Sequence, residues 1–314
     1  MVASQARRIV EAVETAIVGK RQTVQSALAV LLSNGHLLIE DIPGVGKTTL
    51  AKALAKALGC EFKRIQFTPD LLPSDITGTS VFNQKNSEFE FRHGPVFANI
   101  VLADEINRST PKTQASLLEC MEERQVTADG TTYKLPEPFF VIATQNNIEL
   151  SGTYPLPEAQ LDRFTARISV GYPGQQDELR ILENQVKMRP VDSIEAVMNA
   201  EEVVAIQAAI RDVHIDPTLR EYILALVVAT REHTSVSLGA SPRGSLSLLY
   251  ASQALAAIGG RAYVSPDEIK AMAAPVLAHR VIVRPEHRIK GQTAQGVVQE
   301  ILQRIPVPVG VAAR

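Results

Sequence analysis

Tryptophan is absent from the 314-residue sequence, and aromatic residues make up only 5 % of it. A protein that binds single-stranded nucleic acid by stacking bases needs a platform of aromatic side chains, and this composition does not indicate one. The net charge of −2 provides no basic excess for a nucleic-acid backbone either. No apolar run approaches the roughly 18 residues that a membrane-spanning helix needs, so we expect no membrane insertion.

Cysteine is also scarce: Cys60 and Cys120 are far apart in the sequence and have no metal-ligating neighbours. Both lie in helical patterns as small apolar residues, so we expect two reduced thiols in the core. Reduced thiols fit a reducing compartment. The N-terminal segment 1–8 is followed by an amphipathic stretch with Glu11 and Glu14, which is not typical of a signal peptide, and a cytoplasmic location is predicted.

What the chain does contain is an ordinary globular composition, with 45 % apolar and 21 % charged residues, and enough length for two domains. Segments with strand character alternate with helical patterns in the first half of the chain. This alternation predicts an α/β fold, with a parallel sheet covered by helices on both faces. The predicted strands are 36–40, 61–67, 99–103, 139–144 and 166–170.

Two predicted β-hairpins interrupt the alternation. One pairs 79–82 with 89–91, and the other pairs 125–127 with 132–134 around a strong Asp-Gly turn signal at 129–130. Insertions of this kind on a rigid sheet are usually working loops, although they can also be decorative.

A break at 172–174 marks a predicted domain boundary, which gives an α/β domain over 1–171 and a smaller helical domain over 172–314. The second domain is predicted to be nearly all helical, and no role is assigned to the tail 291–314. Its predicted helices are about 175–187, 200–211, 217–232, 244–258 and 266–277.

The most informative segment is 41–49, directly after the apolar run 37–39. Its glycines, Gly44 and Gly46, allow a tight loop whose backbone N–H groups point inward at the start of a helix, which suits a polyphosphate. Lys47 can reach the β- and γ-phosphates of a nucleotide.

Thr48 and Asp41 complete the loop in different ways. The Thr48 hydroxyl can ligate Mg²⁺. Asp41 stands where the full phosphate-loop pattern has a glycine. Because a carboxylate would repel phosphates, we expect the Asp41 side chain to point away from the pocket. A strand–turn–helix with an exposed lysine is the alternative interpretation of the loop alone.

A second motif, Asp104-Glu105, ends the buried strand predicted at 99–103. Ligands of open parallel sheets bind at the carboxyl ends of the strands. Asp104 would then lie within water-mediated reach of the same Mg²⁺, and Glu105 would polarise a water in line with the γ-phosphate. Acidic pairs can also simply cap strands, but the two motifs in this order predict hydrolysis of a nucleoside triphosphate.

With these motifs, the sequence resembles the MoxR family of AAA+ ATPases over roughly residues 5–290, and the motifs occur in the family order. Segment 41–48 is similar to the Walker A of this family, in which an acidic first residue is familiar. The Walker B similarity extends through 103–114. The other matching segments are 143–146 (sensor 1), 157–164 (arginine finger), 239–243 (sensor 2) and 18–20 (adenine contact).

The resemblance implies a role for each matching side chain. It implies ATP and Mg²⁺ as cofactors, with the metal held by Thr48 and Asp104. The implied catalytic residues are Glu105, Asn146, Arg163 and Arg243. The implied nucleotide-binding residues are Pro43, Gly44, Val45, Gly46, Lys47, Thr48 and Thr49, with Val18 and Gly19 against adenine.

Elementary chemistry supports several of these roles. The amide of Asn146 ends a strand beside Asp104 and can hydrogen-bond the attacking water or the γ-phosphate. Arg163 precedes the last strand, far from its own phosphate loop, so it could reach a phosphate only on a neighbouring copy. Arg167 competes with Arg163 for that role, and a surface salt bridge is the alternative for Arg163. Arg243 could fold onto the γ-phosphate from the second domain.

The resemblance also implies an AAA+ domain followed by a helical lid, assembled as a hexameric ring. The two hairpins would be the helix-2 insert and the pre-sensor-1 hairpin. Relatives act in chaperone-like fashion on protein complexes, with von Willebrand factor A domain partners that would here be separate proteins. The alternatives are a nucleic-acid-stimulated motor and the motor subunit of a metal-chelatase-like complex. A small-molecule kinase or GTPase is disfavoured, because Glu105 and Asn146 suit water as the nucleophile and no guanine-binding motif is visible.

Overall fold

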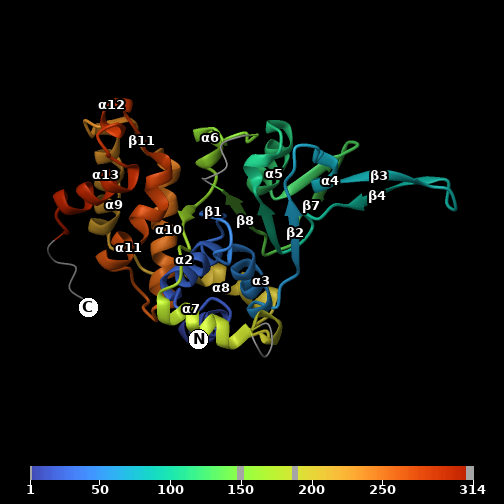
Figure 1. The fold of residues 1–314 in the computed structure, drawn as a ribbon, viewed down its shortest axis with the longest axis horizontal. Helices are drawn as coiled ribbons and strands as arrows, with labels where there is room; N and C mark the ends of the chain where they lie inside the picture. The colour runs from blue at the N-terminus through green and yellow to red at the C-terminus, as the bar shows by residue number, and fades with distance from the viewer. Residues whose placement is uncertain (1, 147–151, 186–189, 309–314) are drawn as a thin grey trace.

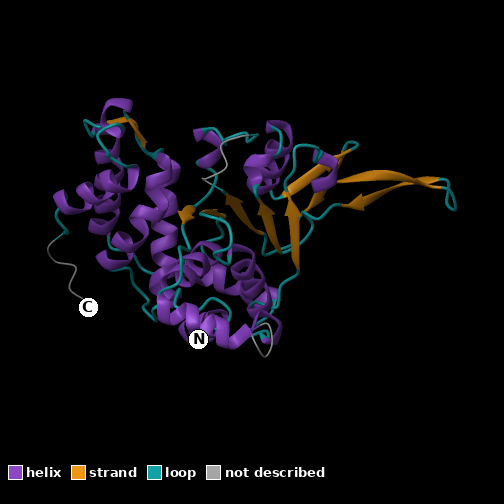
Figure 2. Cartoon of the chain, in the orientation of Figure 1, coloured by secondary structure: helices purple, strands orange, loops and turns teal. Residues whose placement is uncertain are grey.

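The computed structural model describes residues 2–146, 152–185 and 190–308. Its centre is a five-stranded parallel sheet in the order β2-β5-β8-β1-β9 (Figures 1 and 2). The predicted α/β fold is confirmed, and each predicted strand overlaps an observed one. The strands are β1 (Leu37–Glu40), β2 (Phe62–Gln66), β5 (Ile100–Asp104), β8 (Phe140–Gln145) and β9 (Ala166–Ile168).

Alternate residues of the central strands enter two different cores. Leu102 and Ile142 face one core, which includes the helices α1, α2 and α3, whereas Val101 and Val141 face the other, which includes α4 and α5. Every residue of β5 is buried, as expected for a strand that is covered on both faces. The helices are α1 (Val2–Glu14), α2 (Arg21–Leu32), α3 (Lys47–Ala57), α4 (Pro73–Thr77) and α5 (Pro111–Glu123).

Both predicted hairpins are present. The first consists of β3 (Gly78–Asn83) and β4 (Glu88–His93) and extends away from the body as a long arm (Figure 1). The second consists of β6 (Gln125–Ala128) and β7 (Thr131–Lys134). The Phe91 and Tyr133 rings stack at 4.3 Å between centroids, so the two hairpins are packed together at the base of the arm.

The predicted helices after β9 are confirmed, except that residues 186–187 of the first one lie outside the described residues. Several of them begin at a capping residue followed by proline. Asp216, Ser241 and Ser265 each accept a hydrogen bond from a backbone N–H in the first turn of the following helix. The elements are α6 (Glu158–Leu161) before β9, then α7 (Gln175–Gln185), α8 (Ala200–Ile210), α9 (Pro217–Glu232), β10 (Val236–Leu238), α10 (Pro242–Ile258), α11 (Pro266–Leu277), β11 (Ile282–Val283), α12 (Pro285–Arg288) and α13 (Ala294–Arg304).

The helices after β9 contact the sheet domain at several places. Helix α10 packs against α2, and α11 packs against the edge strand β9. Residues before and within α8 also reach the first domain, because Val197 N–H donates to the Ala57 carbonyl and Gln207 Nε2 donates to the Leu31 carbonyl. The division of the chain at residue 171 stays a prediction.

One cysteine lies elsewhere than predicted. Cys120 is buried in α5, but Cys60 is only partly buried and follows the end of α3, because Gly59 takes a positive φ of 59° and closes the helix. Burial raises the pKa of Cys60 to about 11 and that of Cys120 to about 12, so both thiols are protonated at neutral pH.

The C-terminal residues that received no role contain a helix. Thr293 caps α13, which packs against α9 and α11, and residues 309–314 lie outside the described part of the chain. Across the described residues, none of the helices combines the length and apolar character that a membrane span requires.

Candidate active site

Two glycines shape the loop between β1 and α3. Gly44 and Gly46 have φ values of 84° and 93°, a left-handed conformation that favours glycine. Helix α3 begins immediately afterwards, at Lys47, so the backbone N–H groups of its first turn have no earlier helical carbonyl to bond. An anion is the natural partner of such groups.

This loop forms one wall of a pocket of about 320 Å³, within the usual range for small-molecule sites. Both predicted motifs and the predicted sensor asparagine line it. The lining residues are Pro43, Gly44, Gly46, Lys47, Thr48, Thr49, Asp104, Glu105 and Asn146. Val45 does not line the pocket, and its side chain packs against the core instead.

Lys47 is one of the residues that line this pocket. Its Nζ donates to the carbonyl of Asp41 (2.7 Å) and more distantly to that of Gln145 (3.3 Å). Burial lowers the pKa of Lys47, although the charges of Asp41, Asp104 and Glu105 oppose this effect. Because its hydrogen-bond partners within the described part of the chain are carbonyls, this half-buried cation can turn to phosphate oxygens without leaving a carboxylate unpaired.

The Asp41 carboxylate points away from the pocket, as predicted. Its Oδ2 accepts hydrogen bonds from the Ser169 hydroxyl (2.8 Å) and from the N–H groups of Val170 and Gly171 (2.7 Å each). Burial by itself would raise the pKa of Asp41, but these hydrogen bonds and one from Ile42 N–H lower it below its usual value. The carboxylate therefore ties the start of the loop to the segment that follows β9.

Asp104 is buried and its carboxylate has partners on both neighbouring strands. Thr144 Oγ1 donates to Asp104 Oδ1 (2.7 Å), and Arg64 donates to Oδ2 through Nε (3.0 Å) and Nη2 (2.7 Å). The Thr144 hydroxyl also accepts from Glu105 N–H (2.8 Å), which fixes the end of β5 relative to β8.

Glu105 adopts a left-handed backbone conformation, with φ 57°, directly after β5. Its Oε2 accepts hydrogen bonds from Gln66 Nε2 (2.9 Å) and Arg108 Nη1 (2.9 Å). Arg64, Gln66 and Arg108 were missed by the sequence reasoning. The available signal was the alternation of Arg64 and Gln66 in a predicted strand, but it gave no indication that β2 lies beside β5.

The segment expected to contact adenine lies near the loop. A side chain at Gly46 would meet the Ile17 Cδ1 atom at 3.4 Å, so the residues before Val18 and Gly19 pack beside the loop. Gly19 is itself close to Asp177 of α7. Val18 and Gly19 do not line the pocket that contains the glycine loop.

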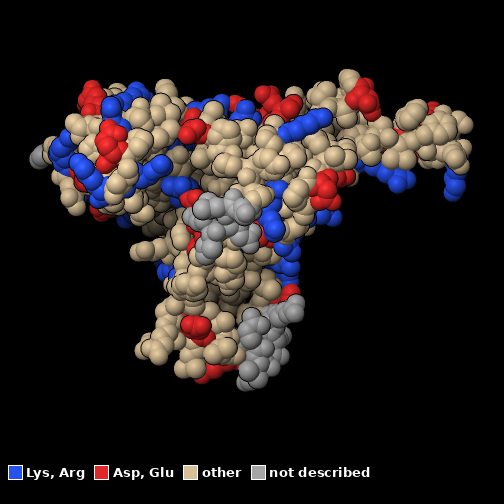
Figure 3. Space-filling view, turned by 45° about the horizontal axis from the view of Figure 1, so that its top comes forward, with Lys and Arg blue, Asp and Glu red and all other residues tan. Residues whose placement is uncertain are grey.

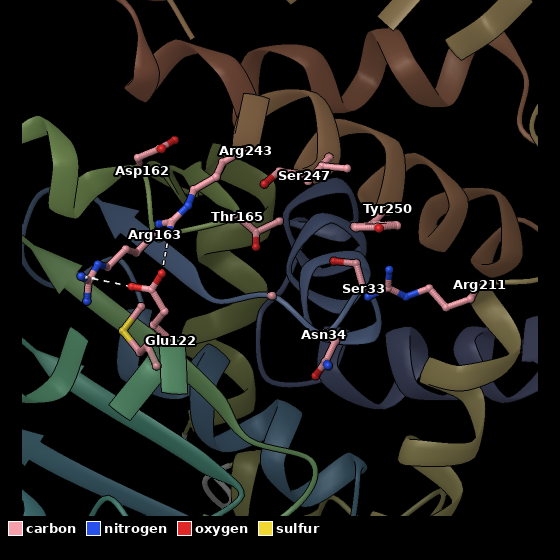
Figure 4. A pocket seen from close by; sticks show the side chains of 13 residues that line it. Ser33, Asn34, Glu122, Asp162, Arg163, Thr165, Arg211, Arg243, Ser247 and Tyr250 are labelled. Carbon is pink, nitrogen blue, oxygen red and sulfur yellow. Dashed lines mark hydrogen bonds and ion pairs between the residues drawn. The ribbon is translucent and has the colours of Figure 1, made fainter. Parts of the chain in front are cut away.

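Arg163 and Arg243 lie in a different hollow, at the junction of α5, the residues after α6 and the start of α10 (Figure 4). Both guanidinium groups contact Glu122: Arg163 Nη2 lies 3.1 Å from Oε2, and Arg243 Nη2 contacts Oε1. Neither arginine lines the pocket of the phosphate loop. Here Asp162 accepts a hydrogen bond from Ser241 at the start of α10, and Glu122 contacts the Arg243 guanidinium. The expected contact of Arg243 with a γ-phosphate stays a prediction.

Arg167 has a partner within its own chain. Its Nη1 lies 2.6 Å from Glu40 Oε2, and the side chain lines a third hollow, beside α2 and α11. Arg163 is also paired within its own chain, with Glu122, so the choice between Arg163 and Arg167 stays a prediction.

Comparison with known proteins gives consistent matches along the chain. Residues 36–166 match the model of the ATPase family associated with various cellular activities (AAA), and residues 228–301 match that of the AAA lid domain. Protein YeaC of Bacillus subtilis is 51 % identical over 302 residues, covering 96 % of this chain and 94 % of YeaC.

Two further matches add a name and a solved structure. Chaperone MoxR1 of Mycobacterium tuberculosis is 39 % identical over 310 residues, covering 96 % of this chain and 82 % of the relative. The crystal structure of a candidate ATPase from Cytophaga hutchinsonii has a TM-score of 0.91 at 39 % identity, and the match covers 98 % of this chain and 96 % of that one.

The contacts of Asp41 lead to a stability prediction. We expect Asp41→Asn to lower the free energy of unfolding by about 1–3 kcal/mol near neutral pH, because buried donors lose their charged acceptor. The folded-state pKa of Asp41 is depressed. Its contribution is therefore complete above the unfolded pKa of about 3.9 and is lost as the pH falls through the folded value. Urea unfolding near neutral pH and again near pH 3 (roughly one unit below that reference) measures both effects.

Asp212→Asn is the matched control, because Asp212 is exposed and its carboxylate has no bonding partner among the described residues. That variant should change stability by less than about 0.5 kcal/mol. Two results would contradict the assigned role of Asp41. One is an equal loss in the free energy of unfolding in both variants. The other is a difference in the free energy of unfolding between wild type and Asp41→Asn that does not become smaller at low pH.

Proposed function

Because this chain belongs to the MoxR family of AAA+ ATPases, we propose that it hydrolyses ATP with Mg²⁺ and uses the reaction to remodel or mature protein complexes. The observation that carries the proposal is the single pocket lined by the glycine loop, Lys47, the acidic pair and Asn146. These residues provide an anion cradle, a phosphate-binding cation, carboxylates and an amide at one edge of the sheet.

The residues of the pocket suit a magnesium ion. Thr48 and Asp104 both line it, and hydroxyl and carboxylate oxygens are the hard ligands that Mg²⁺ prefers. Bound there with the nucleotide, the ion would neutralise charge on the phosphates. Asp104 is paired with Arg64, so we propose that this arginine releases Oδ2 when the metal–nucleotide complex binds.

Glu105 is the proposed general base. A carboxylate in this position can accept a proton from the water that attacks the γ-phosphate, while Asn146 orients that water. In the structure, Gln66 and Arg108 bond to the carboxylate of Glu105. Both of these bonds are made to Oε2, so Oε1 is the proposed acceptor of the proton from the water.

Arg163 and Arg243 are proposed to act on ATP bound to a neighbouring copy. Support comes from their position in a hollow separate from the phosphate pocket of their own chain. A site completed by the next copy requires a head-to-tail ring, and a hexamer is the proposed form. An arginine supplied in this way typically accelerates phosphoryl transfer by about 10³–10⁵.

The hairpin arm is the proposed point of contact with a client protein, and a cytoplasmic von Willebrand factor A domain protein is the proposed partner. The arm projects from the body and exposes Phe82 and Phe89 near its tip. The name of Chaperone MoxR1 supports a chaperone-like role. A metal-chelatase-like complex would differ only in its partner.

A nucleic-acid-stimulated motor receives less support. On the face shown in Figure 3, basic and acidic side chains are interspersed over the body. A DNA- or RNA-stimulated ATPase rate that falls steeply with salt would favour that alternative.

Substitutions in the pocket test the assignment of the chemistry. We expect Glu105→Gln to bind ATP but to hydrolyse it about 10²–10⁴ times more slowly, since the general base is lost. Lys47→Ala should lose most of its nucleotide affinity in a fluorescent-nucleotide titration. Lys52→Ala, an exposed lysine of the same helix, is the matched control and should behave as wild type. A near-normal rate for Glu105→Gln would refute the catalytic assignment.

Mixing experiments test whether Arg163 acts between copies. Arg163→Ala alone should lose most ATPase activity, and Lys47→Ala alone should also be inactive. In a mixture, the Arg163→Ala copy keeps an intact phosphate loop, and the Lys47→Ala copy keeps an intact Arg163. Where the Lys47→Ala copy presents its arginine to the loop of the Arg163→Ala copy, the shared site is complete. Activity should therefore return in part, and no recovery at any mixing ratio would argue against action in trans.

A further inference from the structure

Glu122 is the acidic partner of both arginines that the proposed function assigns to a neighbouring site. One carboxylate oxygen faces Arg163 at 3.1 Å, and the other contacts Arg243 (Figure 4). Among the described residues, Glu122 is the only carboxylate within ion-pair distance of either guanidinium. The two cations come from different parts of the chain and meet at this single anion.

Asp162 fixes the positions of the two segments that carry Arg163 and Arg243. Asp162, adjacent to Arg163, accepts a hydrogen bond from Ser241 (2.9 Å), the residue that caps α10 two positions before Arg243. Asp162 also pairs with Arg280 (2.7 Å), whose side chain is only 2 % exposed. This buried pair sets the separation of the two arginine-bearing segments, and it leaves Asp162 committed to other partners.

Glu122 is fixed as well. The preceding residue, Met121, accepts a hydrogen bond at its carbonyl from the buried His36 ring (3.0 Å). His36 Nδ1 accepts from Val141 N–H in the central sheet, which assigns the proton to Nε2. Two residues later, Arg124 donates to the Asn34 carbonyl (2.8 Å). The last turn of α5 is thus anchored to the sheet domain on both sides of Glu122.

The location of Glu122 has no benefit for its own helix. It stands in the last turn of α5, which contains no basic residue, and the helix dipole disfavours a negative charge there. The groups in this cluster are also accessible, with side-chain exposures of 34 % for Glu122, 32 % for Arg163 and 49 % for Arg243. Ion pairs with this exposure are weak and readily exchanged.

We infer that Glu122 is a positioning residue, which holds Arg163 and Arg243 together in the isolated subunit and releases them to the terminal phosphate of ATP on a second copy of this chain. The inference rests on the proposed function, because it requires ATP as the incoming anion. A phosphate with more charge and more acceptor oxygens replaces a single carboxylate. Glu122 thereby prevents repulsion between the two cations before assembly and competes with the nucleotide afterwards.

The test compares Glu122→Gln with wild type in the full-length chain. Removal of the competing charge should lower the ATP concentration for half-maximal hydrolysis by about three- to tenfold, the equivalent of one or two exposed ion pairs. The maximal rate per subunit should stay within about twofold, since the arginines remain and Glu122 touches no reacting atom. Sedimentation velocity with a non-hydrolysable ATP analogue should show oligomers at correspondingly lower analogue concentrations.

Glu119→Gln is the matched control, because Glu119 lies one turn earlier on α5, is exposed, and forms no ion pair with another described residue. This variant should change neither the ATP concentration for half-maximal hydrolysis nor the analogue concentration at which oligomers form. Thermal unfolding establishes that each variant is folded. If Glu122→Gln does not fold, Glu122→Asp serves instead, because the shorter side chain cannot span both guanidinium groups and should produce a smaller shift in the same direction.

The outcomes separate the two proposals. If Glu105→Gln hydrolyses ATP as fast as wild type, the proposed chemistry fails, and the assembly measurement with the analogue still tests Glu122. If Glu105→Gln is inactive as expected, but the folded Glu122 variant needs as much ATP as wild type or more, the inference about Glu122 is overturned. A loss of maximal rate without a change in the ATP requirement would also overturn it.

Discussion

The arrangement of the site depends on the parallel pairing of β8 between β5 and β1. Leu102 and Ala103 of β5 pair with Ile142 and Ala143, while Leu38 and Ile39 of β1 pair with Ala143 and Thr144. This register brings the glycine loop, the acidic pair and Asn146 to the same carboxyl edge. The side chains of all three strands are divided between two buried cores, so a shift by one residue would place apolar groups on the wrong face.

Within that frame, the charged groups of the site have internal partners. Lys47 contacts backbone carbonyls, Asp104 pairs with Arg64, and Glu105 bonds to Gln66 and Arg108. The two distant arginines share Glu122 in the same way. In the proposed reaction, ATP and its metal replace these contacts. In each exchange a charged group passes from one polar or ionic partner to another, which costs much less than leaving a buried charge unpaired.

The sequence was sufficient for the features that arise from local patterns. Gly44, Gly46 and Lys47 predict their loop because positive φ and a helix start are local requirements, and the apolar runs around Leu102 and Ile142 predict buried strands. Partners that depend on strand order could not be predicted: Gln66 reaches Glu105 only because β2 lies beside β5. Arg243 and Glu122 are separated by 121 positions, and only the folded chain brings the start of α10 close to the end of α5. Cys60 was assigned to a helical pattern, although it follows Gly59, whose positive φ ends α3.

The central claim is that one chain holds ATP between its loop at residues 43–48 and its acidic pair at 104–105, while the next chain supplies an arginine. A cryo-electron microscopy structure of the Glu105→Gln protein with ATP tests this claim most directly. The account predicts the triphosphate in the pocket beside Lys47, with the Arg163 guanidinium of an adjacent copy at the γ-phosphate. Nucleotide bound at another place, or a γ-phosphate contacted only by arginines of its own chain, would contradict it.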